Sequence, residues 1–85
     1  MRIIFSPDAL QAKEHFKKHA PKKDEKIKAI IEDILRTPYS GLGKPEPLKH
    51  DLSGCWSRRI DREHRLVYMV DGDTLFVVSC RYHYR

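Results

Sequence analysis

The apolar and polar positions at the start of the chain predict a strand followed by a helix. Residues 2–5 form a short, mostly apolar run that is typical of a strand. Ser6, Pro7 and Asp8 then supply an N-cap, a proline at the first helical position and an acidic residue in the first turn. A first helix is therefore predicted to run to about Ala20, where the proline that follows stops it.

Apolar stripes at helical spacing predict a helical hairpin in the first half of the chain. The first helix has a modest stripe that contains Leu10 and Phe16, helped by alanines. In the second helix, five apolar residues fall at i, i+3, i+4, i+7 and i+8, the spacing of one buried face. These residues are Ile27, Ile30, Ile31, Ile34 and Leu35. Two helices joined at a proline imply an antiparallel arrangement.

The pattern changes to a loop and then to strands. Residues 37–47 contain three prolines and two glycines, which predicts a structured loop that is neither helix nor strand. Residues 55–60, 65–70 and 74–82 are rich in β-branched and aromatic residues, and residues 71–73 are a strong hairpin turn between the last two runs. The order β-α-α-β-β-β predicts an α+β fold, with the helical hairpin on one face of a small, mainly antiparallel sheet.

Length and charge narrow the picture. Residues 1–85 are expected to form one domain with one small core, which leaves no room for a large internal substrate cavity. The formal net charge is +5, from 17 Lys and Arg against 12 Asp and Glu. Eight of the nine lysines lie in residues 13–44, whereas all six cations of residues 51–85 are arginines. Because the planar guanidinium suits phosphate, the second half is expected to hold the functional surface.

Other classes of protein are disfavoured by the composition. No apolar run approaches the ~20 residues that a membrane-spanning helix needs, and the first residues lack the apolar region of a secretory signal. A cytoplasmic protein without membrane association is therefore expected. Cys55 and Cys80 have no CxxC spacing, so neither a zinc site nor a disulfide framework is indicated, and buried thiols are the simpler interpretation.

The face of the predicted sheet that the helices leave open offers groups suited to RNA cleavage. The strands, the loop before them and the end of the chain supply Glu46, Lys49, His50, Arg58, Arg59, Arg65 and the run Arg81, Tyr82, His83, Tyr84, Arg85. If these groups converge, a base can take the proton of the ribose 2′-hydroxyl, cations can stabilise the pentavalent phosphate and an acid can protonate the leaving oxygen. The tyrosine rings can stack on a splayed nucleotide. This chemistry needs no metal ion.

Each of these groups also has a simpler interpretation. Glu46, between two prolines, can also be only a solvated loop residue, and His83 can also be a surface histidine near a frayed end. The arginines Arg58, Arg59 and Arg65 are equally partners for carboxylates across neighbouring strands. The lysines of the first helix either contact RNA or form a solvated face.

Five segments of the chain match one known family almost continuously from residue 36 to residue 84. They are 36–39 (RTPY), 41–49 (GLGKPEPLK), 52–60 (LSGCWSRRI), 64–68 (HRLVY) and 80–84 (CRYHY). In these segments the chain closely resembles the YoeB/Txe family of bacterial toxins in the RelE superfamily. Residues 1–35 agree with that family in the order of elements more than in sequence.

The resemblance implies the toxin of a type II toxin–antitoxin module, a metal-independent endoribonuclease without a cofactor. Such a toxin enters the ribosomal A site, cuts the mRNA there and is held inactive by a YefM-like antitoxin. Relatives can dimerise, so a homodimer stays an option. An antitoxin segment is predicted to cover the basic face or the sheet edge, with acidic residues meeting Arg58, Arg59 or Arg65.

The resemblance also implies roles for individual residues. Glu46 would be the general base and His83 the general acid, with the division between the two left open. Arg65 would stabilise the transition-state phosphate, and Tyr84 would orient that phosphate or stack on a base. The residues that would hold the RNA backbone are Lys49 and Arg59.

Two functions without RNA cleavage compete with this interpretation. One is an inhibitor of DNA gyrase like the ParE branch of the same fold, and the other is a plain RNA-binding module. A pure binding module has no need for Glu46, Arg65 and His83 together, which argues against both. The codon preference and the oligomeric state are not predicted by the sequence.

Overall fold

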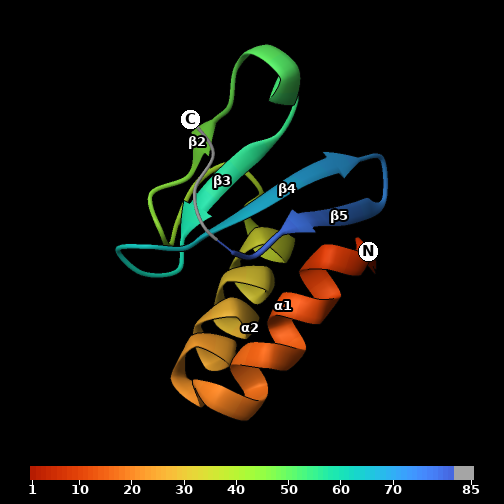
Figure 1. Cartoon of the computed structure of the whole chain (residues 1–85). Coiled ribbons are helices and arrows are strands. Elements are labelled where there is room, and N and C mark those ends of the chain that lie inside the picture. Colours follow the sequence, from red (N-terminus) through yellow and green to blue (C-terminus); the bar gives the residue numbers. More distant parts are fainter. Residues whose placement is uncertain (82–85) are drawn as a thin grey trace.

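The computed structural model describes residues 1–81 and contains two helices packed against a five-stranded sheet (Figure 1). The helices are α1 (Pro7–His19) and α2 (Pro21–Arg36). The strands are β1 (Arg2–Phe5), β2 (Glu46–Pro47), β3 (Trp56–Arg59), β4 (Arg65–Asp71) and β5 (Thr74–Ser79), and a single 3₁₀ turn, η1, spans His50–Leu52. No helix within residues 1–81 is long and apolar enough to cross a membrane.

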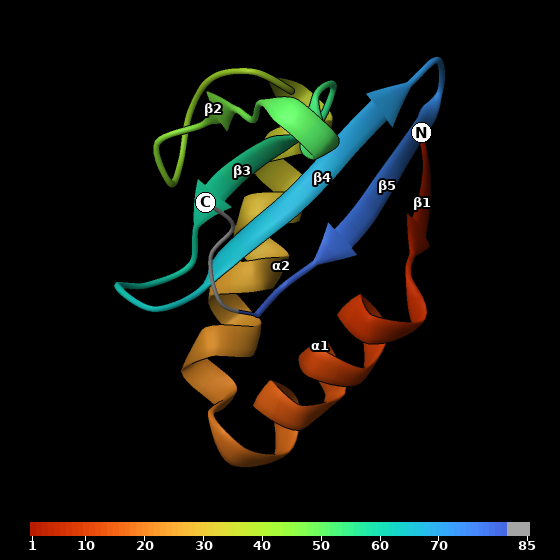
Figure 2. The same cartoon turned by 45° about the horizontal axis from the view of Figure 1, so that its top comes forward.

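The sheet has the order β1-β5-β4-β3-β2, so that the first strand and the shortest strand form its two edges (Figure 2). β1 pairs with β5 in parallel, and the other three pairs are antiparallel. Both helices lie on the same side of the sheet (Figure 1). The predicted α+β fold, with a helical hairpin on one face of a mainly antiparallel sheet, is confirmed. We call the face that points away from the helices the outer face.

Ser6 connects the start of α1 to β5. Its hydroxyl accepts a hydrogen bond from the backbone N–H of Ala9 at 3.0 Å, as an N-cap does, and donates one to the carbonyl of Val78 at 2.7 Å. Pro21, which was expected only to stop the first helix, is also the first residue of α2. Proline suits that position because the N–H that it lacks would have no partner inside the helix.

The helices bury narrower stripes than the sequence predicted. On α1 the buried residues are Ala9, Ala12 and Phe16, whereas Leu10 is 48% exposed. Leu10 follows Ala9 by one residue, which turns it about 100° around the helix and away from the sheet. On α2 the four isoleucines are buried as predicted, but Leu35, at the border of the stripe, is 36% exposed.

The core lies between the helices and the inner face of the sheet. Its sheet residues alternate along β4 and β5: Leu66, Tyr68, Leu75 and Val77 are all at most 1% exposed. Cys80 joins the same cluster, and burial raises the pKa of its thiol to about 12. Cys80 is therefore the buried thiol that the sequence predicted, while Cys55 is half-buried.

Two strand boundaries differ from the prediction. Residues 37–47 were expected to contain no strand, but Glu46 and Pro47 pair with Ser57 and Trp56 of β3. A proline is tolerated here because β2 is an edge strand, where one backbone N–H can be missing without breaking a central ladder. The last strand was expected to reach residue 82 but ends at Ser79.

Candidate functional site

Glu46 and Arg65 form an ion pair on the outer face of the sheet. One terminal nitrogen of the guanidinium, Nη1, lies 2.6 Å from Glu46 Oε1. The register explains the pairing, because Glu46 lies opposite Ser57 on β3 and Arg65 lies opposite Arg59 on the same strand. Ser57 and Arg59 are two residues apart in β3 and so share a face. Sequence positions 19 residues apart are thereby brought into contact.

Arg65 binds a second side chain besides Glu46. The same Nη1 donates to the hydroxyl oxygen of Ser57 at 3.0 Å. The side chain of Arg65 is only 15% exposed, whereas that of Glu46 is 54% exposed. A half-buried guanidinium beside an exposed carboxylate can receive an anion and leave the carboxylate open to solvent. Ser57 is a site residue that the sequence reasoning missed, and its position opposite Glu46 is visible only once the register is known.

Arg59 lies beside Arg65 on the outer face. Its side chain is exposed, and its backbone N–H donates to the carbonyl of Gly43 at 2.6 Å. Arg59 and Arg65 line a hollow of about 220 Å³ together with Asp61 and Arg62. The structure therefore brings together Glu46, Arg59 and Arg65 among the residues predicted from the sequence.

The other predicted residues are not brought into this cluster by any contact within residues 1–81. Lys49 is exposed at the start of η1 and forms no ion pair with the described part of the chain. His50 follows it, also exposed, with a positive φ of 60°. His83 and Tyr84 lie outside the described residues, so their place in the site stays a prediction.

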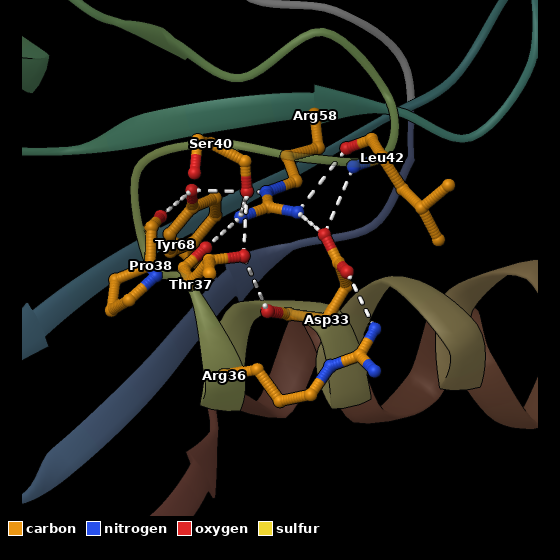
Figure 3. Close-up of polar contacts among 8 residues, drawn as sticks. All are labelled: Asp33, Arg36, Thr37, Pro38, Ser40, Leu42, Arg58 and Tyr68. Carbon is orange, nitrogen blue, oxygen red and sulfur yellow. Dashed lines mark hydrogen bonds and ion pairs between the residues drawn. The ribbon is translucent and has the colours of Figure 1, made fainter.

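Arg58 was expected on the outer face, and that expectation is wrong. Its side chain is completely buried and points toward α2, because it alternates with its neighbours Ser57 and Arg59 (Figure 3). Its Nη1 lies 2.6 Å from Oδ2 of Asp33. Asp33 stands on the buried face of α2, three residues after Ile30. A carboxylate inside that apolar stripe is the sequence signal that would have indicated a buried cation.

The remaining N–H groups of Arg58 bind the loop that follows α2 and one side chain of β4 (Figure 3). Its Nη2 donates to the carbonyls of Thr37 and Ser40 at 2.6 and 2.9 Å, and its Nη1 also donates to the carbonyl of Leu42 at 3.2 Å. Its Nε donates to the hydroxyl oxygen of Tyr68 at 3.2 Å. We call this set of contacts, with the ion pair to Asp33, the arginine clamp.

Tyr68 extends the arginine clamp to another loop residue. Its hydroxyl donates to the carbonyl of Pro38 at 2.5 Å while accepting from Arg58. Burial raises the pKa of Tyr68, so that the hydroxyl keeps the proton it donates. The two side chains together therefore satisfy four carbonyl groups of a loop that has no regular secondary structure.

Asp33 is fixed from three directions. It accepts the backbone N–H of Leu42 at 2.9 Å and the side chains of Arg58 and Arg36. Together these contacts lower the pKa of its carboxyl from 3.8 to about 2, with the largest effect from Leu42, then Arg58, then Arg36. A Cβ at Gly41 would lie 2.1 Å from Asp33 Oδ2, and the φ of this residue is +113°, so glycine is required where the loop passes the carboxylate.

The arginine clamp determines where Glu46 begins. The loop leaves the clamp at Leu42, its next residue Gly43 accepts the N–H of Arg59, and Glu46 follows three residues later as the first residue of β2. The carboxylate is thus held at Arg65 by a loop whose backbone is tied to the core. Within residues 1–81 no group of three or more His, Cys, Asp or Glu side chains is placed to hold a metal ion.

Comparisons with known proteins agree on one family. The family model of the YoeB-like toxin of bacterial type II toxin–antitoxin systems matches residues 5–84. The toxin YoeB of Escherichia coli O6:H1 is 50% identical over 84 residues, 99% of this chain and 100% of the relative. The solved YoeB/ParE toxin from Agrobacterium tumefaciens is 44% identical with a TM-score of 0.96, covering 99% of this chain and 100% of its own.

A third relative has been solved in two assemblies. YoeB from Staphylococcus aureus is known as a dimer and in a complex with YefM, with TM-scores of 0.93 and 0.92 to this chain. Both chains are 44% identical to this one, and each match covers 99% of this chain and 98% of the other. The likeness therefore extends over practically the whole length of these proteins.

The arginine clamp predicts that replacing Arg58 and replacing Arg36, which both bind Asp33, lower the free energy of unfolding by very different amounts. Arg58→Leu should lower the free energy of unfolding by about 3–5 kcal/mol, because it leaves a buried carboxylate and several loop carbonyls without their partner. Arg36→Leu removes an arginine that is 76% exposed and should cost less than about 1 kcal/mol. Urea unfolding followed by far-UV circular dichroism measures both. Equal costs for the two variants would mean that the clamp does not hold the fold.

The lowered pKa of Asp33 predicts a loss of stability in acid. A carboxyl whose pKa is lower in the folded state than in the unfolded chain stabilises the fold above its unfolded pKa. That contribution should disappear between about pH 4 and pH 2, as the pH falls from 3.8 toward the folded value of about 2. The melting temperature, measured from pH 5 to pH 2, should fall less steeply in Asp33→Asn than in the wild type. An identical slope would show that another carboxyl causes the loss.

Proposed function

The chain belongs to the YoeB-like toxins of bacterial type II toxin–antitoxin systems, and on that premise we propose that it is a ribosome-dependent endoribonuclease. The toxin would enter the ribosomal A site and cut the mRNA there, in the cytoplasm. The observation that carries this proposal is the ion pair of 2.6 Å between Glu46 and Arg65 on the outer face, since it joins a carboxylate that is 54% exposed to an arginine side chain that is 15% exposed.

The two groups suit attack by a ribose 2′-hydroxyl on the neighbouring phosphate. The Glu46 carboxylate takes the hydroxyl proton, and the 2′-oxygen forms a bond to phosphorus. Arg65 stabilises the added negative charge on the phosphate oxygens. The bond from phosphorus to the 5′-oxygen breaks, and His83 gives that oxygen a proton. The products are a 2′,3′-cyclic phosphate and a 5′-hydroxyl, with no metal ion or other cofactor in the sequence of steps.

The contacts of Arg65 support the roles assigned to Arg65 and Glu46. The hydrogen bonds of Arg65 to Glu46 and Ser57, both described residues, are made by one nitrogen, Nη1. A phosphate that binds the other N–H groups of the fork can be held bidentately without displacing Ser57. The bound phosphate shares the positive charge of Arg65, which weakens the ion pair with Glu46 and lets the carboxylate act as the base. The roles of His83, Tyr84 and Lys49 rest on the family resemblance.

The ribosome supplies what a chain of 85 residues does not contain. A ribose and its phosphate must be aligned for in-line attack, and holding them in that geometry contributes a large part of the rate. In the A site the mRNA is already held by the ribosome. The toxin then needs to add only its carboxylate, its arginines and its acid.

We further propose a YefM-like antitoxin as the inhibitor of this site. The Staphylococcus aureus relative forms a complex with YefM. An acidic antitoxin segment would meet Arg59 and Arg65, which lie on the outer face, but not Arg58, which is buried against α2. A homodimer, as solved for the same relative, is a second assembly that this chain would form.

Translation reactions with a defined mRNA test the proposed activity. Wild-type protein should cut the mRNA at discrete positions only when ribosomes are present, as mapped by primer extension. Glu46→Gln should slow the cutting by at least about 100-fold, the usual effect of losing a general base. The matched control is Glu32→Gln, which removes an exposed carboxylate from α2 and should cut like the wild type.

Three results would overturn the assignment. Full activity of Glu46→Gln would exclude this carboxylate as the base. Cutting of free mRNA at the same rate would exclude the ribosome as a partner. Inhibited translation without any cut, retained in Glu46→Gln, would favour a non-catalytic inhibitor of the same fold.

A further inference from the structure

Two hollows with shared lining residues lie between Arg65, the turn between β3 and β4, and α2. The hollow of about 220 Å³ at Arg65 is also lined by Arg59, Asp61 and Arg62. A second hollow of about 390 Å³ is lined by the same three residues and extends further. Its additional lining residues are Lys26, Gly43, Lys44 and Ile60. Because three residues line both hollows, the two adjoin, and we call them together the basic groove.

Apart from Arg65, which pairs with Glu46, the cations of the basic groove have no carboxylate partner among the described residues. Lys26, Lys44, Arg59 and Arg62 have no ion pair with any described residue. In contrast, several cations elsewhere in the chain each lie within 4 Å of a carboxylate. They are Lys13, Lys23, Lys28, Arg36 and Arg58. Like charges that gather around a hollow without an internal partner raise the local concentration of anions.

Asp61 supplies the one carboxylate among the described residues that line the groove, and other groups of the protein already bind it. Asp61 Oδ1 accepts the backbone N–H groups of Glu63 and His64 at 2.8 and 2.7 Å. Its Oδ2 lies 2.9 Å from Nζ of Lys23 on α2. The charge of Asp61 is thus compensated from the side of the helix, and the four unpaired cations determine the sign of the groove.

The walls of the groove are held in place by contacts within the protein. Gly43 has a φ of +79°, and a Cβ there would meet the carbonyl oxygen of Arg59 at 2.9 Å. The loop can therefore lie directly against β3 only with glycine at this position. On the other side, the ion pair between Lys23 and Asp61 ties the β3–β4 turn to α2. Both walls belong to segments that the core holds, which lowers the entropic cost of binding.

We propose that the basic groove binds the sugar–phosphate backbone of RNA beyond the phosphate that Arg65 contacts. This inference rests on the proposed function, because it takes Arg65 as the position of the scissile phosphate. The nucleotides that continue from that phosphate meet Arg59 and Arg62 next, and Lys44 and Lys26 after them. RNA of either source, the message or the ribosomal RNA, presents the same phosphates. The contacts are electrostatic and independent of the base sequence.

Binding measurements on two triple variants test the groove. One replaces the groove cations that lie outside the candidate catalytic cluster: Lys26→Gln, Lys44→Gln and Arg62→Gln. The matched control removes three exposed charges from the helices, Lys17→Gln, Lys18→Gln and Lys22→Gln, which have no ion pair with any described residue. Each triple variant lowers the net charge by three. Thermal melts establish that both are folded.

The readouts are the affinities for a fluorescent single-stranded RNA of ten nucleotides and for vacant ribosomes, between 50 and 200 mM salt. The groove variant should bind at least about tenfold more weakly, and the slope of log K against log salt should fall by about 2, roughly 0.7 for each lost contact with a single strand. The control should stay within about twofold. A loss with the free RNA identifies the message as the ligand, and a loss confined to ribosomes identifies ribosomal RNA.

Several outcomes would overturn the inference. Wild-type affinity of the groove variant for both probes would do so, as would equal losses in the two triple variants. A groove variant weakened only toward the antitoxin would show that the groove receives a protein. These results are distinct from failure of the proposed function, which appears as an absence of cutting by the wild type and leaves the binding measurements readable.

Discussion

The buried guanidinium of Arg58 is the constraint on which the candidate site depends. A charge that is completely removed from water is tolerated only when it is paired and when its N–H groups all have acceptors. Asp33 supplies the charge, and the carbonyls of Thr37, Ser40 and Leu42 supply the acceptors. The loop after α2 cannot move away without leaving that charge unsatisfied. A segment rich in proline and glycine is thereby tied to buried side chains of α2 and β3.

This constraint separates two adjacent arginines into two different roles. Strand alternation sends Arg58 inward to the loop and Arg59 outward to the face that carries Arg65. The same loop then delivers Glu46 to Arg65 at the edge of the sheet. The inner face of β3 fixes the position of the catalytic carboxylate that we propose, and the outer face presents the cations. The small size of the chain is compatible with the enzyme that we propose, because the proposed site is a surface and the ribosome would hold the substrate.

Periodicity, together with the capping residues at the start of the first helix and the turn residues at 71–73, predicted both helices, that turn and the α+β arrangement, because these signals are local and regular. The apolar pattern placed Leu10 in the buried stripe of α1. Leu10 is apolar like the residues of that stripe, but it lies on another side of the helix and is exposed. The pattern also missed β2, which depends on the pairing with β3, and the inward direction of Arg58, whose partner Asp33 is 25 residues away. The pairing of Glu46 with Arg65 arises from the same long-range register. The family resemblance supplied the roles of these residues, which no local pattern contains.

Hydrogen exchange of the native protein tests most directly whether the arginine clamp fixes the loop that carries Glu46. The amide of Leu42, bonded to Asp33, and the amide of Arg59, bonded to Gly43, report on the loop at its two anchors. Both should exchange at rates close to that of the amide of Ile30 in α2, because the loop opens only when the core does. Exchange that is orders of magnitude faster at Leu42 and Arg59 than at Ile30 would show a loop that moves independently of the core, and would contradict the account.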